Sequence, residues 1–94
     1  MNTFFLNQKT PDEYSVLIAN RLRDLRKQSK LSQSKLSDKS NVSLGSIKRF
    51  ENCGEISLKS LIKIAIALDV DRDLELLFAE RKIQSIQEVI DGQD

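Results

Sequence analysis

The chain has 94 residues, of which 39% are hydrophobic, so its length and composition allow one small folded domain with a modest core. It has no histidine and one cysteine, which excludes an intramolecular disulfide and a zinc site of the usual kind. No apolar run approaches the roughly 18–20 residues of a membrane span, and residues 1–10 lack the features of a signal peptide. We therefore expect a cytoplasmic protein that needs no cofactor or metal and contacts no membrane.

The net charge of +1 hides an uneven distribution of charge along the chain. Residues 21–63 hold eleven basic and four acidic side chains, a net charge of +7, whereas residues 64–94 have a net charge of −5. A basic segment can contact phosphate groups while an acidic segment stays away from them. This pattern favours a nucleic acid as the partner of residues 21–63.

Residues 1–9 are expected to form an N-terminal extension, which is followed by a helix. The extension contains Phe4-Phe5-Leu6, an apolar stretch that packs either on its own domain or on a second subunit. Thr10-Pro11-Asp12-Glu13 is typical of a helix start, because Thr and Glu form a capping box and Pro suits the first helical position. Apolar residues at helical spacing continue this helix to about Gln28.

Residues 31–54 are expected to form two short helices joined by a tight turn. Ser32 and Ser43 each precede a helical pattern and can accept hydrogen bonds from free backbone N–H groups. Asn41 suits the left-handed conformation that ends a helix. The apolar positions of the pair are Leu36, Val42, Ile47 and Phe50.

The second helix of this pair has an outward face suited to the major groove of DNA. The face is short or polar at its N-terminal end and basic further along, and it consists of Leu44, Gly45, Ser46, Lys48, Arg49 and Asn52. The alternative is an ordinary helical hairpin whose polar face is simply solvated.

Two further helices are predicted after Gly54, which should end the third. Ser57 should cap the fourth, whose wide apolar arc leaves some surface for a partner. A fifth short helix should begin at Asp71 and turn three side chains inward, namely Leu74, Leu77 and Phe78. This completes an expected domain of residues 10–78.

Residues 79–94 are expected to form a C-terminal tail. Ser85 and Glu88 have the spacing of a capping box, and Ile86, Val89 and Ile90 line one side of the same segment. A helix this short is marginal alone, so the tail docks on the domain, folds on binding a partner, or frays.

Taken in this order, the elements resemble the helix-turn-helix of the phage-repressor family (Cro/CI, also called XRE). The resemblance covers roughly residues 16–78 without gaps and is carried by Leu22-Arg23-Asp24-Leu25-Arg26, Leu31-Ser32-Gln33, Leu36-Ser37, Val42-Ser43, Ile47-Lys48-Arg49-Phe50-Glu51-Asn52 and Leu61-Ile62-Lys63-Ile64-Ala65-Ile66-Ala67-Leu68. It implies an all-α fold, a compact five-helix phage-repressor-like DNA-binding domain with a short C-terminal tail. The chain departs from the common family residues at Lys35, Ser37, Asn41 and Cys53, and none of these departures removes a core residue.

The resemblance also implies which residues contact DNA. These are Gln33, Ser34, Ser43, Leu44, Gly45, Ser46, Lys48, Arg49 and Asn52. Leu44 offers an apolar contact such as one to a thymine methyl, and Gly45 lets the backbone come close. Lys48 and Arg49 are the expected donors to bases or phosphates.

The same resemblance gives more specific roles to four residues. Gln33 and Asn52 are expected to contact the DNA backbone. The matched family positions further imply a structural ion pair between Arg26 and Glu51, which links the first and third helices.

These features predict a sequence-specific DNA-binding transcriptional regulator, usually a repressor, that acts as a homodimer on a palindromic operator in a bacterium or phage. A second interpretation is a HipB-like antitoxin that autoregulates its operon and neutralises a toxin kinase, because residues 85–90 resemble a tail of that branch. A third is a protein-interaction module that kept the fold without DNA binding. An enzyme is not expected, because histidine, a glycine-rich phosphate loop and an evident carboxylate pair are missing from the sequence.

Overall fold

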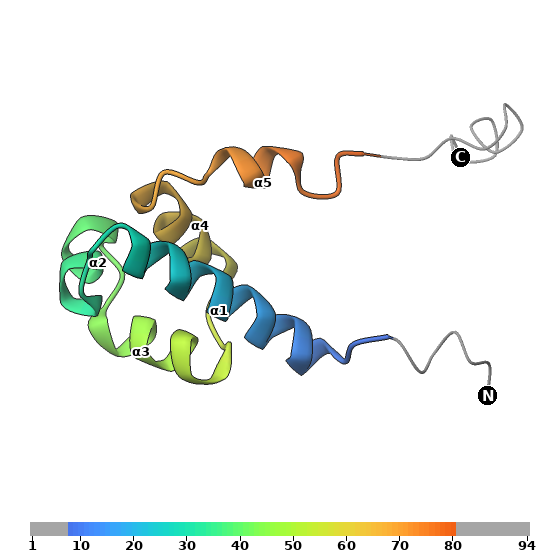
Figure 1. The fold of residues 1–94 in the computed structure, drawn as a ribbon, viewed down its shortest axis with the longest axis horizontal. Coiled ribbons are helices and arrows are strands. Elements are labelled where there is room, and N and C mark those ends of the chain that lie inside the picture. Colours follow the sequence, from blue (N-terminus) through green and yellow to red (C-terminus); the bar gives the residue numbers. More distant parts are fainter. Residues whose placement is uncertain (1–7, 81–94) are drawn as a thin grey trace, which may run out of the picture.

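The computed structural model describes residues 8–80 of the chain. Two sequence-based expectations fall outside this range: the packing of Phe4-Phe5-Leu6 and the conformation of the tail segment 85–90. Within the described range the fold is all-helical, as predicted, and contains five helices in the order expected from the sequence (Figure 1). They are α1 (Pro11–Gln28), α2 (Gln33–Ser40), α3 (Leu44–Cys53), α4 (Leu58–Ala67) and α5 (Arg72–Leu76).

Local side-chain chemistry sets the start of each of the first four helices. Thr10 and Glu13 form the predicted capping box, with Thr10 N donating to Glu13 Oε1 at 3.0 Å and Glu13 N to Thr10 Oγ1 at 3.1 Å. Ser32, Ser43 and Ser57 each accept a hydrogen bond from the backbone N–H three residues later. Each such cap satisfies one of the backbone donors that a helix start leaves free.

Left-handed residues end α2 and α3. Asn41 adopts φ 61° and Gly54 adopts φ 80°, and the N–H of each bonds to a carbonyl one turn back in its helix. Gly54 is also held by packing, because a Cβ atom at this position would lie 2.9 Å from the carbonyl carbon of Ser15 in α1. The end of the third helix is therefore pressed directly against α1.

The core lies where α1, α2, α3 and α4 meet. The predicted apolar positions of residues 31–54 are all buried, and Leu36, Ile47 and Ile64 are the largest side chains that are sealed completely. The buried cluster comprises Ala19, Leu36, Val42, Ile47, Phe50, Ile64, Ala67 and Leu68. Burial of each large side chain contributes about 1.5–3 kcal/mol, so these contacts hold α3 firmly on the body of the domain.

The prediction for the fifth helix was wrong in part. Leu74 is half-buried as expected, but Leu77 and Phe78 are 54% and 77% exposed rather than inward. The reason is that α5 already ends at Leu76: Leu77 adopts an extended backbone and Phe78 a positive φ of 59°. The helical spacing that would have turned both side chains inward is lost there.

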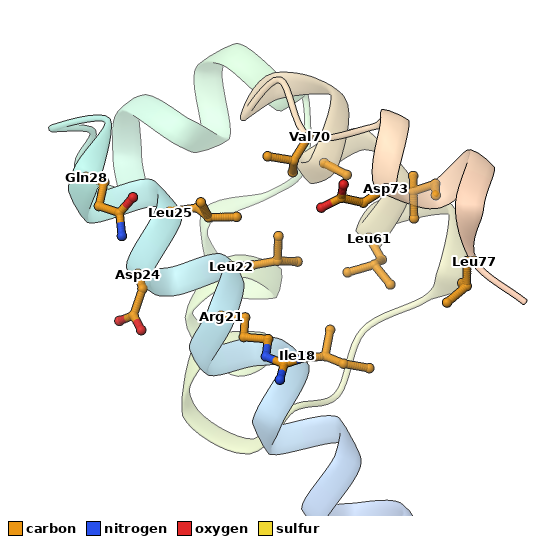
Figure 2. Close-up of a pocket in the computed structure, with 12 residues that line it drawn as sticks. Ile18, Arg21, Leu22, Asp24, Leu25, Gln28, Leu61, Val70, Asp73 and Leu77 are labelled. Atoms are coloured by element: carbon orange, nitrogen blue, oxygen red, sulfur yellow. The ribbon is translucent and has the colours of Figure 1, made fainter.

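An apolar groove of about 470 Å³ runs between α1, α4 and the segment around α5. Figure 2 shows Leu22 and Leu25 of α1 facing Leu61 of α4 and Val70 across this groove. Figure 1 shows α5 and α3 on opposite sides of α1. The groove, which we call the α1–α5 groove, therefore lies away from the third helix.

Candidate nucleic-acid interface

The third helix presents one buried and one open face. Ile47 and Phe50 are 0% and 2% exposed and fix the inner face in the core. On the other side Gly45, Lys48, Arg49 and Asn52 are exposed, while Leu44 and Ser46 are half-buried. The expected outward face therefore exists, although its first turn is more covered than its second.

Serine hydroxyls hold the N-terminal end of α3. Ser43 Oγ accepts from Ser46 N at 3.1 Å and also lies 2.8 Å from Ser46 Oγ, to which it is hydrogen-bonded. In the turn before it, Ser37 Oγ donates to the Val42 carbonyl at 2.6 Å. The Ser37 bond ties α2 to the turn that leads into α3, and it thereby helps to fix the direction in which the outward face points.

A network centred on Glu51 joins three helices. Arg26 of α1 donates from Nε to Glu51 Oε2 at 2.7 Å and from Nη2 to Glu51 Oε1 at 2.9 Å. Gln33, the first residue of α2, donates from Nε2 to Glu51 Oε1 at 2.9 Å. The third nitrogen of Arg26 donates to the Leu31 carbonyl at 2.7 Å, so every nitrogen of this guanidinium has a partner within the domain.

The Arg26 and Glu51 side chains are only 10% and 7% exposed. Burial raises the pKa of the Glu51 carboxyl, but hydrogen bonds from Arg26 and Gln33 and the charge of Arg26 outweigh it and hold the pKa below its ordinary value. Glu51 is therefore ionised at neutral pH. This charged network fixes α3 on α1 and α2 at the level of the outward face.

A polar pocket of about 210 Å³ opens beside the network. It is lined by Arg23, Arg26, Gln33, Lys48, Glu51 and Asn52. Because Arg26 and Glu51 neutralise each other, Arg23 and Lys48 give the pocket its net positive charge. Such a pocket suits an anionic group that accepts hydrogen bonds.

Arg49 is paired with Glu55, which follows directly after Gly54. The Nε of Arg49 donates to Glu55 Oε2 at 2.8 Å, and Nη2 donates to the same oxygen. These hydrogen bonds and the charge of Arg49 lower the pKa of Glu55 and raise that of Arg49. The exposed Cys53 lies beside the pair, with Sγ 3.1 Å from the Arg49 carbonyl oxygen.

Residues 22–74, more than half of the chain, match the model of a helix-turn-helix family. The chain belongs to the Cro/CI-type (XRE) helix-turn-helix family. No curated protein and no solved structure gives a significant match.

Membership of the XRE family makes α2 and α3 the helix-turn-helix and the chain a DNA-binding transcription regulator. The family is in general not one of enzymes. Within residues 8–80, no helix is long and apolar enough to span a bilayer, and His, Cys, Asp and Glu form no metal-binding group.

The XRE residues expected to contact DNA lie on two neighbouring surfaces. Leu44, Gly45 and Arg49 lie along α3, whereas Gln33, Lys48 and Asn52 line the polar pocket beside it. Ser34 is exposed on the first turn of α2. Ser43 caps the third helix by accepting from the Ser46 backbone N–H, and the two hydroxyls also bond to each other.

Sequence reasoning missed three features of this XRE domain. Arg23 belongs to the stretch that carries the family resemblance, but nothing in the sequence indicates that it lines the polar pocket. Gln33 was expected to face a phosphate, and its bond to Glu51 was not foreseen. The pairing of Glu55 with Arg49 was the third. The sequence feature that could have indicated it is Gly54, whose left-handed backbone brings the next residue back toward Arg49.

Proposed function

We propose that this protein is a sequence-specific transcriptional repressor that binds a palindromic operator as a homodimer. The observation that supports it most directly is the positive polar pocket beside an exposed, partly basic α3. An α-helix fits the major groove, and a cationic pocket at its edge suits the adjacent phosphate. Together they supply a base-reading element and a backbone anchor.

Each exposed side chain receives a role in this proposal. Arg49 and Lys48 donate to base edges or to phosphates, with guanine as the natural target of Arg49. Leu44 contacts a thymine methyl, and Gly45 lets the helix backbone approach the base pairs. Ser34, Ser43 and Ser46 contribute polar groups at the helix starts.

The DNA backbone is held at the polar pocket. Gln33 and Asn52 contact a phosphate there, and Arg23 and Lys48 supply positive charge. The Gln33 amide nitrogen has two hydrogens, and its bond to Glu51 uses one. Glu51 therefore orients Gln33 and leaves its second N–H for the phosphate.

Dimerisation is proposed at the apolar surface of α4 and of the segment around α5. Large side chains remain exposed there, namely Leu58, Ile62, Ile66, Leu76, Leu77 and Phe78. Exposed apolar side chains in this number favour a partner protein, and a two-fold dimer would present two recognition helices to a palindrome. Sedimentation of the wild type and of a Leu76→Ser, Phe78→Ser variant tests this: a monomeric variant with a dimeric wild type is the expected result.

DNA binding is tested by selection of preferred duplexes from a random library, followed by anisotropy titrations at several salt concentrations. Lys48→Ala should weaken binding and, if it removes one phosphate contact, lower the salt slope by about 1. Arg21→Ala is the matched control, because it removes an exposed positive charge that lines the α1–α5 groove, on the side of α1 away from α3. Equal effects of the two variants, or a wild type that enriches no sequence, would refute the proposal.

A second candidate function is that of a HipB-like antitoxin. It is favoured by the sequence of residues 85–90 and by the α1–α5 groove, which leaves a surface for a partner protein on the side away from α3. Expression with the neighbouring genes provides the test. Co-purification of a larger kinase that dissociates when the exposed groove residue Ile18 is changed to Asp would support this candidate.

A further inference from the structure

Arg49 and Glu55 form an exposed ion pair in which two nitrogens share one carboxylate oxygen. Both Nε and Nη2 of Arg49 donate to the single oxygen Oε2 of Glu55. The side chains are 69% and 61% exposed. Exposed ion pairs contribute only about 0–1 kcal/mol to stability, so stabilisation of the fold does not account for this pair.

The pairing uses one side of the guanidinium and leaves another edge free. Arginine carries five N–H donors in a rigid plane, and Glu55 binds those on the side of Nε. The edge formed by Nη1 and the second N–H of Nη2 has no hydrogen-bond partner in residues 8–80. Two parallel donors on one edge are what the O6 and N7 atoms of guanine accept in the major groove.

Glu55 has a rigid backbone from which to hold Arg49. It lies between Gly54, whose backbone is pressed against Ser15, and Ile56, which packs on the core. Arg49 extends from a helix fixed by the buried Ile47 and Phe50. Both ends of the pair are thus anchored, although the side chains themselves are in solvent.

A carboxylate beside the outward face of α3 lowers the affinity of the protein for DNA. Glu55 is exposed and therefore ionised at neutral pH, and a negative charge close to DNA repels the phosphates. Its presence therefore weakens binding to every sequence equally. A gain in discrimination between sequences would offset that loss.

We propose that Glu55 is a specificity-determining positioning residue, which fixes the Arg49 guanidinium so that its free edge reads a guanine. The proposal rests on the proposed function, because it requires α3 to enter the major groove. Without Glu55, Arg49 would keep its charge and bind DNA, but its side chain would sample many orientations and contact phosphates as readily as bases. Glu55 thus lowers the affinity for DNA of any sequence and raises the selectivity at one base pair.

The test compares Glu55→Gln with Asp38→Asn, a matched control. Asp38 is an exposed carboxylate on the preceding helix α2 and forms no ion pair within residues 8–80. Both variants remove one negative charge close to α3: Asp38 lines a surface pocket with Ser43 at the start of this helix, and Glu55 follows its end. Each is titrated against the duplex that the wild type enriches, against single-pair variants in which each G·C is replaced by A·T, and against an unrelated duplex. Thermal melting by circular dichroism verifies that each variant is folded.

For Glu55→Gln we expect tighter binding to the unrelated duplex and a loss of discrimination at one G·C pair in each half-site. The loss should be about tenfold, which is near the low end for a bidentate arginine contact to guanine. Asp38→Asn should tighten binding to all duplexes and keep the discrimination. In an Arg49→Lys background, which retains the charge but lacks the planar fork, Glu55→Gln should no longer change discrimination.

Three outcomes would overturn the proposal. If Glu55→Gln tightens binding to all duplexes equally, Glu55 is only an electrostatic competitor of DNA. If discrimination falls to the same extent in the Arg49→Lys background, Glu55 does not act through Arg49. If the wild type enriches no sequence, the proposed function itself fails, whereas the first two outcomes leave that function intact.

Discussion

Gln33 Nε2 lies 2.9 Å from Glu51 Oε1, and the same carboxylate accepts two hydrogen bonds from Arg26. One buried side chain of the third helix thus ties together the first residue of α2 and the C-terminal part of α1. Since Glu51 is next to Asn52 and three residues after Lys48, the network also fixes the part of α3 that borders the polar pocket. Fold stability and the geometry of the interface therefore depend on the same contacts.

Replacement of Glu51 by alanine should destabilise the domain by about 3–5 kcal/mol, because it leaves the Arg26 guanidinium buried without its counter-charge. The double variant Arg26→Met, Glu51→Leu should recover much of this loss, since two apolar side chains can fill the same space. Urea denaturation of the wild type and the two variants measures both effects. A cost below about 1 kcal/mol for Glu51→Ala would show that the pair behaves like a surface pair.

Lowering the pH should remove the stabilisation that the Glu51 network gives to the fold. The pKa of Glu51 in the folded domain lies below its ordinary value of about 4.5, so the folded state binds this proton more weakly than the unfolded chain does. The stabilisation is complete above about pH 5 and is lost as the pH falls through the folded-state pKa. The difference in unfolding free energy between the wild type and Glu51→Gln should therefore be constant from pH 6 to 7 and shrink below about pH 4.5. A difference that stays constant down to pH 3 would contradict this prediction.

Gly45→Ala should separate folding from binding. A Cβ atom at this position meets nothing within 4 Å, so alanine should stabilise the helix by about 0.5–1 kcal/mol. If the Gly45 backbone approaches the base pairs as proposed, the same methyl group should weaken operator binding. Thermal melting and anisotropy on one preparation measure the two effects, and unchanged or tighter DNA binding would place Gly45 outside the interface.

Gly54→Ala should act in the opposite direction on stability. The residue has φ 80°, and an added Cβ would lie 2.9 Å from the Ser15 carbonyl carbon, so strain and collision combine to a cost on the order of 2–3 kcal/mol. Asn41→Ala is the control: it has a similar positive φ but already carries a Cβ, so only the strain cost of about 1 kcal/mol remains. Chemical denaturation should rank the two variants in this order, and equal costs would show that Ser15 yields easily.

The helix boundaries followed from the sequence because they depend on local chemistry. Thr10, Ser32, Ser43 and Ser57 cap the backbone a few residues away, and Gly54 ends a helix by its own conformation. Interactions of this range leave a readable pattern in the chain. The inward residues of α2 and α3 followed for the same reason, since helical spacing alone decides them.

Contacts that depend on how one element meets another were harder to predict. Leu77 and Phe78 were assigned inward because the helical spacing was continued past Leu76, where the backbone in fact leaves the helix. The bonds from Gln33 to Glu51 and from Arg49 to Glu55 join residues that no periodicity relates. Each depends on the direction in which a turn sends the chain: Gly54 is held against Ser15 of α1, and α2 packs on α3 and α4.

The α1–α5 groove and the outward face of α3 have no side chain in common. The side chains that line the groove come from α1, from α4 and from residues 70–77, and none belongs to α2 or α3. A change in Lys48 or Arg49 therefore alters no groove side chain, and a change in Leu61 or Leu74 alters no exposed side chain of the third helix. If this groove holds a partner protein as proposed, gene duplicates of this chain can acquire new target sites while keeping that partner, or exchange the partner while keeping the target.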